Sequence, residues 1–173
     1  WDNLNKILEK CPRVNTTIMS TYNALSVPSY KKLIEGVYQL KEEYSSPDRY
    51  WNSATFLDSS YLRYPLHQTV QVLPMKWAQE IHEQAQLLDY YALPVFEHMY
   101  TGYSDIEIQK VKRIYDWMIS RDYSELKNEE VLKRNRHDFG VFFKEHDRRR
   151  GTDFCKVFPE LEEFYHKCLE IKL

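Results

Sequence analysis

Three consecutive arginines, Arg148, Arg149 and Arg150, stand in the charged stretch EHDRRRGTDF near the end of the chain. Guanidinium groups bind carboxylates and phosphates, and the amide of Gly151 would complete an anion site. A structural interpretation is simpler, because arginines in a last helical turn face the negative end of the helix dipole and glycine suits a left-handed cap. We favour the structural interpretation and keep contact with a substrate or partner carboxylate as an open alternative.

The neighbouring Glu145, His146 and Asp147 have the chemistry of metal ligands but not the spacing. Consecutive residues of a helix point in different directions, so these three cannot converge on one ion. The six histidines of the chain show neither HxxxH nor HExxH spacing, and no GxSxG is present. These absences argue against a zinc protease and against a serine hydrolase.

Polar side chains follow the first predicted strand, in the segment STYNALS, and mark a second candidate site. In parallel α/β folds, ligands bind where strands end, so Ser20, Thr21 and Asn23 are candidate ligand contacts. Gln71 holds the comparable position on the second predicted strand. The alternative is an ordinary loop that satisfies its own backbone. In DSSY, Asp58–Tyr61, the polar residues are interpreted as turn formers.

Composition excludes several classes of protein. The 173 residues include only four glycines, which argues against a glycine-rich phosphate loop, and the net charge of −2 attracts neither nucleic acid nor an anionic membrane. Cys11, Cys155 and Cys168 are widely spaced and form no CxxC, which indicates a reduced, cytoplasmic chain. We favour ordinary thiols, and a share of these cysteines in a metal or cluster site is the alternative. No apolar run reaches the roughly 18 residues that a membrane span requires.

Hydrophobic periodicity in the first half predicts helices alternating with strands. A first helix ends at Pro12, and a second runs from Ser26 to Tyr44 with Pro28 in its first turn. The predicted strands are Val14–Met19 and Gln68–Leu73, and an irregular stretch, Asn52–His67, lies between the second helix and the second strand. A further helix follows Pro74 and carries Trp77, Ile81, Ala85 and Leu88 on one face.

The second half is predicted to be helical. Tyr90–Tyr103 is an aromatic connector, Ser104 and Glu107 form a capping box, and Asn128 caps the helix that ends at the arginines. A last helix lies around Phe158–Leu169. We therefore predict two regions, residues 1–90 and residues 91–173.

Two parallel strands cannot form a stable sheet alone, because parallel strands need neighbours and helices on both faces. The predicted fold class is α/β. The predicted architecture is the C-terminal part of a partial (β/α) barrel, with about two parallel strands and their helices, followed by an all-helical C-terminal region.

Four segments resemble a known family: WDNLNKILEK, NTTIMSTYNALSVPSYKKLIEGVYQLK, YLRYPLHQTVQVLP and RHDFGVFFKEHDRRRGTDFCKVFPELEEFY. Together they are similar to the C-terminal part of bacterial twitch-domain-containing radical S-adenosylmethionine proteins. The likeness extends over most of the chain, and the last segment is its most specific part.

The resemblance implies a partial barrel that holds a 4Fe–4S cluster and S-adenosylmethionine. The cofactor would be cleaved reductively to a 5′-deoxyadenosyl radical that abstracts hydrogen from a substrate, either a peptide or a small molecule. By their position at the end of the strand, Ser20, Thr21 and Asn23 would contact the cofactor. The resemblance extends this role more loosely to Gln71 and Leu73. The family's CxxxCxxC motif is absent, so the resemblance implies a fragment whose partner is an N-terminal half of the same polypeptide and which binds neither cofactor alone.

A rival hypothesis comes from a different class of protein. Aromatic residues make up 15% of the chain. A helical, aromatic-rich module could recognise an acidic partner through Arg148–Arg150 without any catalysis.

Overall fold

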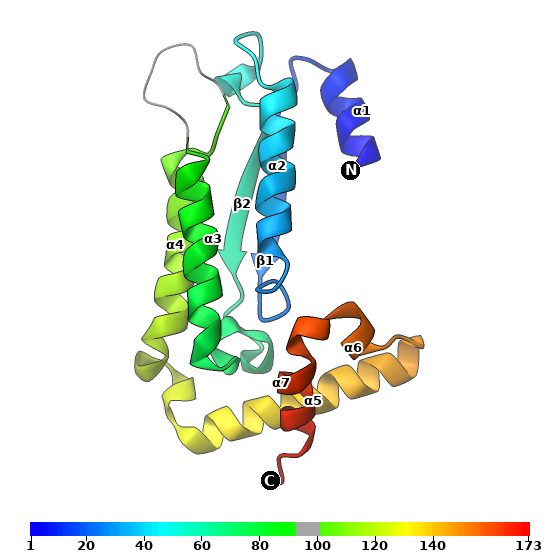
Figure 1. Ribbon diagram of the computed structural model, residues 1–173, viewed down its shortest axis with the longest axis vertical. Coiled ribbons are helices and arrows are strands. Elements are labelled where there is room, and N and C mark those ends of the chain that lie inside the picture. The colour runs from blue at the N-terminus through cyan, green and yellow to red at the C-terminus, as the bar shows by residue number, and fades with distance from the viewer. Residues whose placement is uncertain (93–100) are drawn as a thin grey trace. The chain divides into compact units, whose positions relative to one another are not determined.

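The computed structural model describes residues 1–92 and 101–173, and Figure 1 shows their arrangement in helices and strands. The elements in chain order are α1 (Asp2–Lys10), β1 (Thr16–Tyr22), α2 (Tyr30–Tyr44), β2 (Thr55–Tyr61), α3 (Ala78–Tyr90), α4 (Asp105–Ile119), α5 (Glu129–Arg150), α6 (Phe154–Val157) and α7 (Glu162–Leu169). Most of the predicted Tyr90–Tyr103 connector lies outside the described residues. No helix in the described ranges is both long and apolar enough to cross a membrane.

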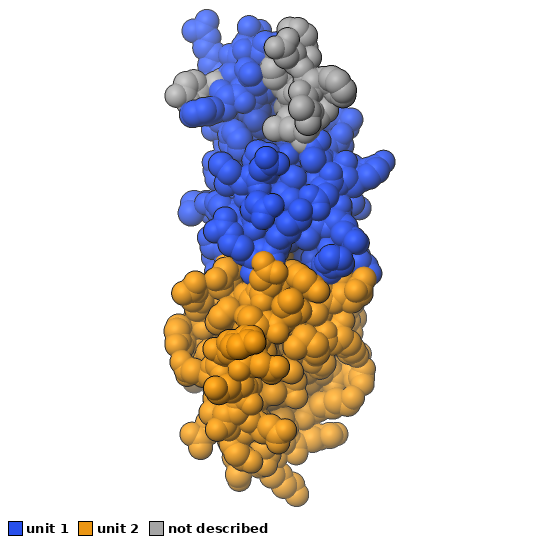
Figure 2. All heavy atoms as spheres, turned by 90° about the vertical axis from the view of Figure 1, so that its left-hand side faces the viewer, with its two compact units in different colours: residues 1–21, 30–60, 81–114 blue, residues 22–29, 61–80, 115–173 orange. Residues whose placement is uncertain are grey.

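The chain divides into two compact units, which Figure 2 colours separately. Unit 1 comprises residues 1–21, 30–60 and 81–114, and unit 2 comprises residues 22–29, 61–80 and 115–173. The division into a barrel part, residues 1–90, and a helical part, residues 91–173, stays a prediction.

The sheet confirms an α/β protein with two parallel strands, but the second strand was predicted in the wrong place. Gln68–Leu73 forms short 3-10 turns, and β2 lies inside the stretch predicted to be irregular. Four consecutive side chains, Val70 to Leu73, are at most 1% exposed, so this segment is enclosed on all sides rather than alternating as a strand does. In β2 the buried alternate positions include Thr55 and Ser59, whose polar side chains hid the alternation.

Backbone hydrogen bonds fix the register of the two strands. The Thr16 N–H donates to the Ala54 carbonyl, and the Leu62 N–H donates to the Tyr22 carbonyl, which places Thr16 opposite Thr55. One face of the sheet therefore carries the alternate residues Ile18, Ser20, Leu57 and Ser59. The opposite face carries Thr17, Met19, Thr21, Phe56, Asp58 and Ser60.

Among the described residues, α1 and α2 cover the first of these faces, whereas the second is more exposed and keeps only Phe56 and Asp58 half-buried. Ile18 packs against Leu40 of α2 and Leu8 of α1, and the Tyr30 hydroxyl of α2 hydrogen-bonds Ser59. On the opposite face Met19 is 81% exposed. We call this second face the open face.

The buried carboxylate of Glu107 occupies the edge of β2 that points away from β1. It accepts hydrogen bonds from the Leu57 N–H at 2.8 Å and from the Ser104 N–H at 2.8 Å, and it pairs with Lys41 Nζ at 3.1 Å. The second of these bonds confirms the predicted capping box at the start of α4. Burial lowers the pKa of Lys41, and the neighbouring Glu107 opposes that shift. One side chain thus joins α2, β2 and α4.

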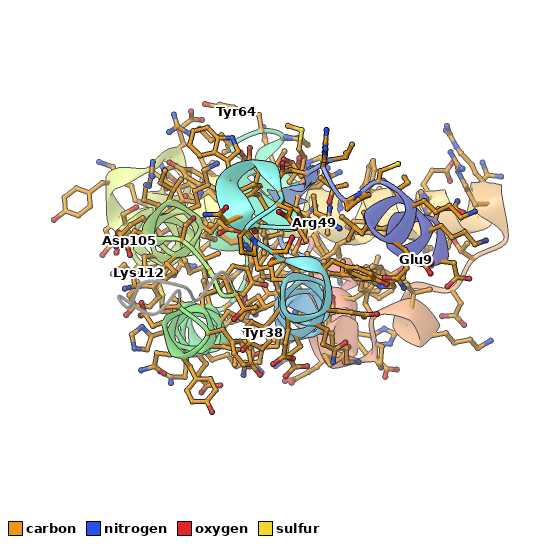
Figure 3. All side chains as sticks on the ribbon, turned by 90° about the horizontal axis from the view of Figure 1, so that it is seen from above. Glu9, Tyr38, Arg49, Tyr64, Asp105 and Lys112 are labelled. Atoms are coloured by element: carbon orange, nitrogen blue, oxygen red, sulfur yellow. The ribbon has the colours of Figure 1, made fainter. Side chains whose placement is uncertain are left out.

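Arg49 also joins several segments, through hydrogen bonds to main-chain carbonyls. Its side chain, labelled in Figure 3, is 5% exposed and donates to the main-chain carbonyls of Leu8, Val14 and Tyr44, at 2.5, 2.7 and 2.5 Å. It also reaches the carbonyl of Cys11 at 3.3 Å. The ends of α1 and α2 are therefore held by one guanidinium group.

In unit 2, α5 and α7 approach closely at Gly140. A Cβ atom at this position would lie 3.1 Å from backbone atoms of Cys168 and Leu169. Around this contact Phe139 packs its ring against Phe143, Phe154 and Phe164. The predicted Asn128 cap of α5 is confirmed, since its side chain accepts the N–H groups of Glu130 and Val131.

We expect Lys41→Met to lower the free energy of unfolding by about 3–5 kcal/mol, because it leaves the Glu107 carboxylate buried without its counter-charge. Urea unfolding of the purified protein measures this loss. Lys112→Met is the matched control: Lys112 pairs with Asp89 at 2.9 Å in the same unit but is 39% exposed, so its loss is expected to stay below about 1 kcal/mol. Equal losses for the two variants would contradict a central role for the Glu107 carboxylate.

Candidate functional site

Ser20 and Thr21, two of the predicted ligand contacts, lie on opposite faces of β1. Ser20 belongs to the covered face, where its hydroxyl hydrogen-bonds Tyr30. Thr21 belongs to the open face and is exposed. Because neighbouring residues of a strand point in opposite directions, these two side chains do not converge on one ligand.

Asn23 forms a local turn at the end of β1. Its Oδ1 accepts the Leu25 N–H at 2.9 Å, and the Ser26 hydroxyl accepts the Asn23 N–H at 3.1 Å. This loop satisfies part of its own backbone, as the alternative interpretation of STYNALS requires. A role of Asn23 in ligand binding stays a prediction.

The open face brings Thr21 together with polar residues of β2 that the sequence interpretation had assigned to a turn. Asp58 and Ser60 lie on this face, and the register places Ser60 opposite Thr21 and Asp58 opposite Met19. The Asp58 carboxylate accepts a hydrogen bond from Lys110 Nζ of α4 at 2.5 Å, and both side chains are about 30% exposed. The face therefore offers hydroxyl groups, a thioether and a carboxylate oriented by an ammonium group. Such a set can bind hydroxyl and amino groups of a ligand.

Gln71 lies in unit 2, in a 3-10 turn instead of at the end of a strand. It is 0% exposed and lines a cavity of about 280 Å³ together with Arg63, Tyr64, Trp117 and Glu125. Gln71 Nε2 donates to the Trp117 carbonyl at 2.5 Å. Contact of Gln71 with a ligand stays a prediction, and the cavity is the place where a ligand could reach it.

Two buried polar atoms of the residues lining this cavity have no hydrogen-bond partner among the described residues: Gln71 Oε1, an acceptor, and Trp117 Nε1, a donor. Unpaired buried polar atoms are costly, and they are often completed by a ligand or water. The Arg63 guanidinium lies over the rings of Tyr61 and Trp117, 5.2 and 6.0 Å from the centroids. An aromatic ring and a guanidinium group therefore lie side by side in the lining of this cavity.

The arginine run has the structure of a helix end. Arg148 donates to both oxygens of Glu145 at 2.7 Å, and Arg149 donates to one at 2.6 Å. These hydrogen bonds lower the pKa of Glu145 to about 2. Gly151 adopts the predicted left-handed cap with φ 65°, and Asp153 caps α6. Arg148 and Arg149 remain 70% exposed and Arg150 is exposed as well, so their contact with an acidic partner stays a prediction.

Searches among protein families, curated proteins and solved structures found no match to this chain.

We expect Gly151→Ala to lower the free energy of unfolding by about 1 kcal/mol, because an alanine in the left-handed region is strained even though no atom lies within 4 Å of the new Cβ. Arg148→Gln, which removes an exposed ion pair, is expected to lower the free energy of unfolding by less than Gly151→Ala does. Thermal unfolding compares the two variants. A larger cost for the arginine variant would show that the run does more than end a helix.

Proposed function

We propose that this chain forms the C-terminal part of a radical S-adenosylmethionine enzyme and supplies two late strands of its partial barrel. The support is the resemblance of four segments to that family, together with the open face of the sheet. Parallel sheets are normally covered on both faces. Among the described residues α2 packs on one face, while Thr17, Met19, Thr21 and Ser60 on the other face are exposed.

In a (β/α) barrel the helices cover the outside of the sheet, and alternate strand residues point to the inside. On this proposal the open face would line the interior of the barrel. Thr21 would keep its role as a cofactor or substrate contact, and Asp58 and Ser60 would join it. Ser20, hydrogen-bonded to Tyr30 on the covered face, would instead support the packing of α2.

The cysteines of this chain do not fit a 4Fe–4S cluster. Cys11 belongs to unit 1, whereas Cys155 and Cys168 belong to unit 2. Burial raises the pKa of Cys168 to about 12, and the three cysteines do not follow the CxxxCxxC spacing of the family's cluster motif. The proposal therefore requires a cluster-binding segment outside these 173 residues, and the residues described here would bind and orient instead of transferring electrons.

Asp58 carries the most specific role that the geometry offers. Lys110 keeps the carboxylate oriented and favours its charged form, and roughly a third of the Asp58 side chain remains accessible. A charged carboxylate can accept hydrogen bonds from a ligand ammonium or hydroxyl group.

The test uses the full gene product with its cluster reconstituted under anaerobic conditions, together with S-adenosylmethionine and a reductant. We expect 5′-deoxyadenosine to form, and we expect Asp58→Asn to weaken binding of cofactor or substrate by about 10- to 100-fold, which corresponds to one charged hydrogen bond. Chromatography quantifies the product, and its dependence on ligand concentration gives the change in binding.

Asp89→Asn is the matched control, because Asp89 also pairs with a lysine in unit 1 but belongs to α3 and not to the open face. Its product formation should stay within about twofold of the unmodified protein. A cluster-loaded protein that forms no 5′-deoxyadenosine would refute the proposed activity. Normal activity of Asp58→Asn would refute only the role of the open face.

A further inference from the structure

Three side chains with metal-ligand chemistry meet in unit 2. His166 Nε2 lies 3.8 Å from Cys155 Sγ and 3.6 Å from Glu162 Oε1. All three ligand atoms lie within 4.8 Å of one another. A sulfur, a nitrogen and an oxygen ligand are thus gathered at one point on the surface.

The fold fixes the backbone on both sides of this cluster. Glu162 and His166 are one helical turn apart on α7, so their side chains lie on the same face. Cys155 comes from α6, and the buried ring of its neighbour Phe154 stacks on Tyr165 with centroids 4.5 Å apart. Because Phe154 precedes Cys155 and Tyr165 precedes His166, this aromatic pair sets the distance between two of the ligands.

The charges around the thiol are negative. Burial raises the pKa of Cys155, and the carboxylates of Glu162, Asp153 and Asp147 raise it further. Asp147 and Asp153 already accept local hydrogen bonds: Asp147 from Thr152 and Phe154, Asp153 from the N–H groups at the start of α6. They would therefore act around a bound cation as fixed charges and not as direct ligands.

We propose that Cys155, Glu162 and His166 bind a divalent transition-metal ion of the zinc type, with solvent as a fourth ligand. Zinc takes sulfur, nitrogen and carboxylate ligands in a tetrahedral arrangement, and its bond lengths imply a sulfur–nitrogen separation of about 3.5 Å. The observed 3.8 Å needs only a small side-chain rotation. Magnesium and calcium prefer oxygen ligands throughout, so the sulfur and the imidazole select against them.

Such an ion would connect α6 to α7, since Cys155 lies on one helix and both remaining ligands on the other. Glu162 and His166 are more than half exposed, so solvent reaches the site. A three-residue site with a solvent ligand has the coordination number of a catalytic zinc centre. The inference is independent of the proposed radical chemistry, because it uses none of the same residues.

The experiment uses the reduced protein after treatment with a chelator. Zn²⁺ binding is measured by calorimetry, and Co²⁺ serves as a spectroscopic probe whose charge-transfer absorption reports a thiolate ligand. We expect one equivalent of metal to bind. Cys155→Ser should abolish the thiolate absorption, and both Cys155→Ser and His166→Ala should weaken Zn²⁺ binding at least about tenfold.

Cys11→Ser and His137→Ala are the matched controls, as they remove one thiol and one imidazole elsewhere in the chain and should leave the binding unchanged. Circular dichroism verifies that each variant is folded. As a second measurement, Zn²⁺ should slow alkylation of Cys155 by iodoacetamide while the exposed Cys11 reacts at its usual rate. Failure to bind Zn²⁺, or equal binding by all four variants as expected of an adventitious ion, would overturn the proposal.

Discussion

A single buried carboxylate, that of Glu107, is the contact on which unit 1 depends. Removing a carboxylate and an ammonium group from water is expensive, and the cost is recovered only when each finds several good partners. Glu107 meets this condition with Lys41, the Leu57 N–H and the Ser104 N–H and hydroxyl. The bond to Leu57 also satisfies an edge position of β2 that a further strand would otherwise occupy. One edge of the small sheet is thus stabilised by a side chain.

This arrangement gives the two surfaces of the sheet different roles. Helices α1 and α2 supply the apolar side chains that pack on the covered face, while on the open face Thr21 and Ser60 are exposed and Asp58 is partly exposed. Lys110 comes from α4, the helix that Glu107 ties to β2. The contact that stabilises the sheet therefore also places the ammonium group that orients Asp58. Stability and the proposed ligand contacts share one helix.

The helix ends were predictable because they depend on residues close together in the sequence. The second strand was predicted in the wrong place because its burial depends on contacts with distant segments. Asn128 and Gly151 act within four residues of themselves, so their caps were visible in the sequence. QTVQVL has the composition of a strand, yet its burial on all sides depends on segments far away in the chain. Conversely, β2 buries Thr55 and Ser59, which no hydrophobic pattern would reveal. The predicted positions of the site residues depended on the predicted strands. Because β2 lies at Thr55–Tyr61, Asp58 is on the open face and not in a turn, and Gln71 lines a cavity instead of ending a strand.

The hydrogen bonds of Arg49 have an evolutionary consequence. All four acceptors are main-chain carbonyls, which every amino acid possesses, so the side chains at positions 8, 11, 14 and 44 can change without removing an acceptor. Insertions or deletions between these positions are different, since they would shift the carbonyls away from a guanidinium of fixed shape. Except at the buried Leu8, this corner of the molecule should therefore tolerate changes of residue type while conserving the number of residues.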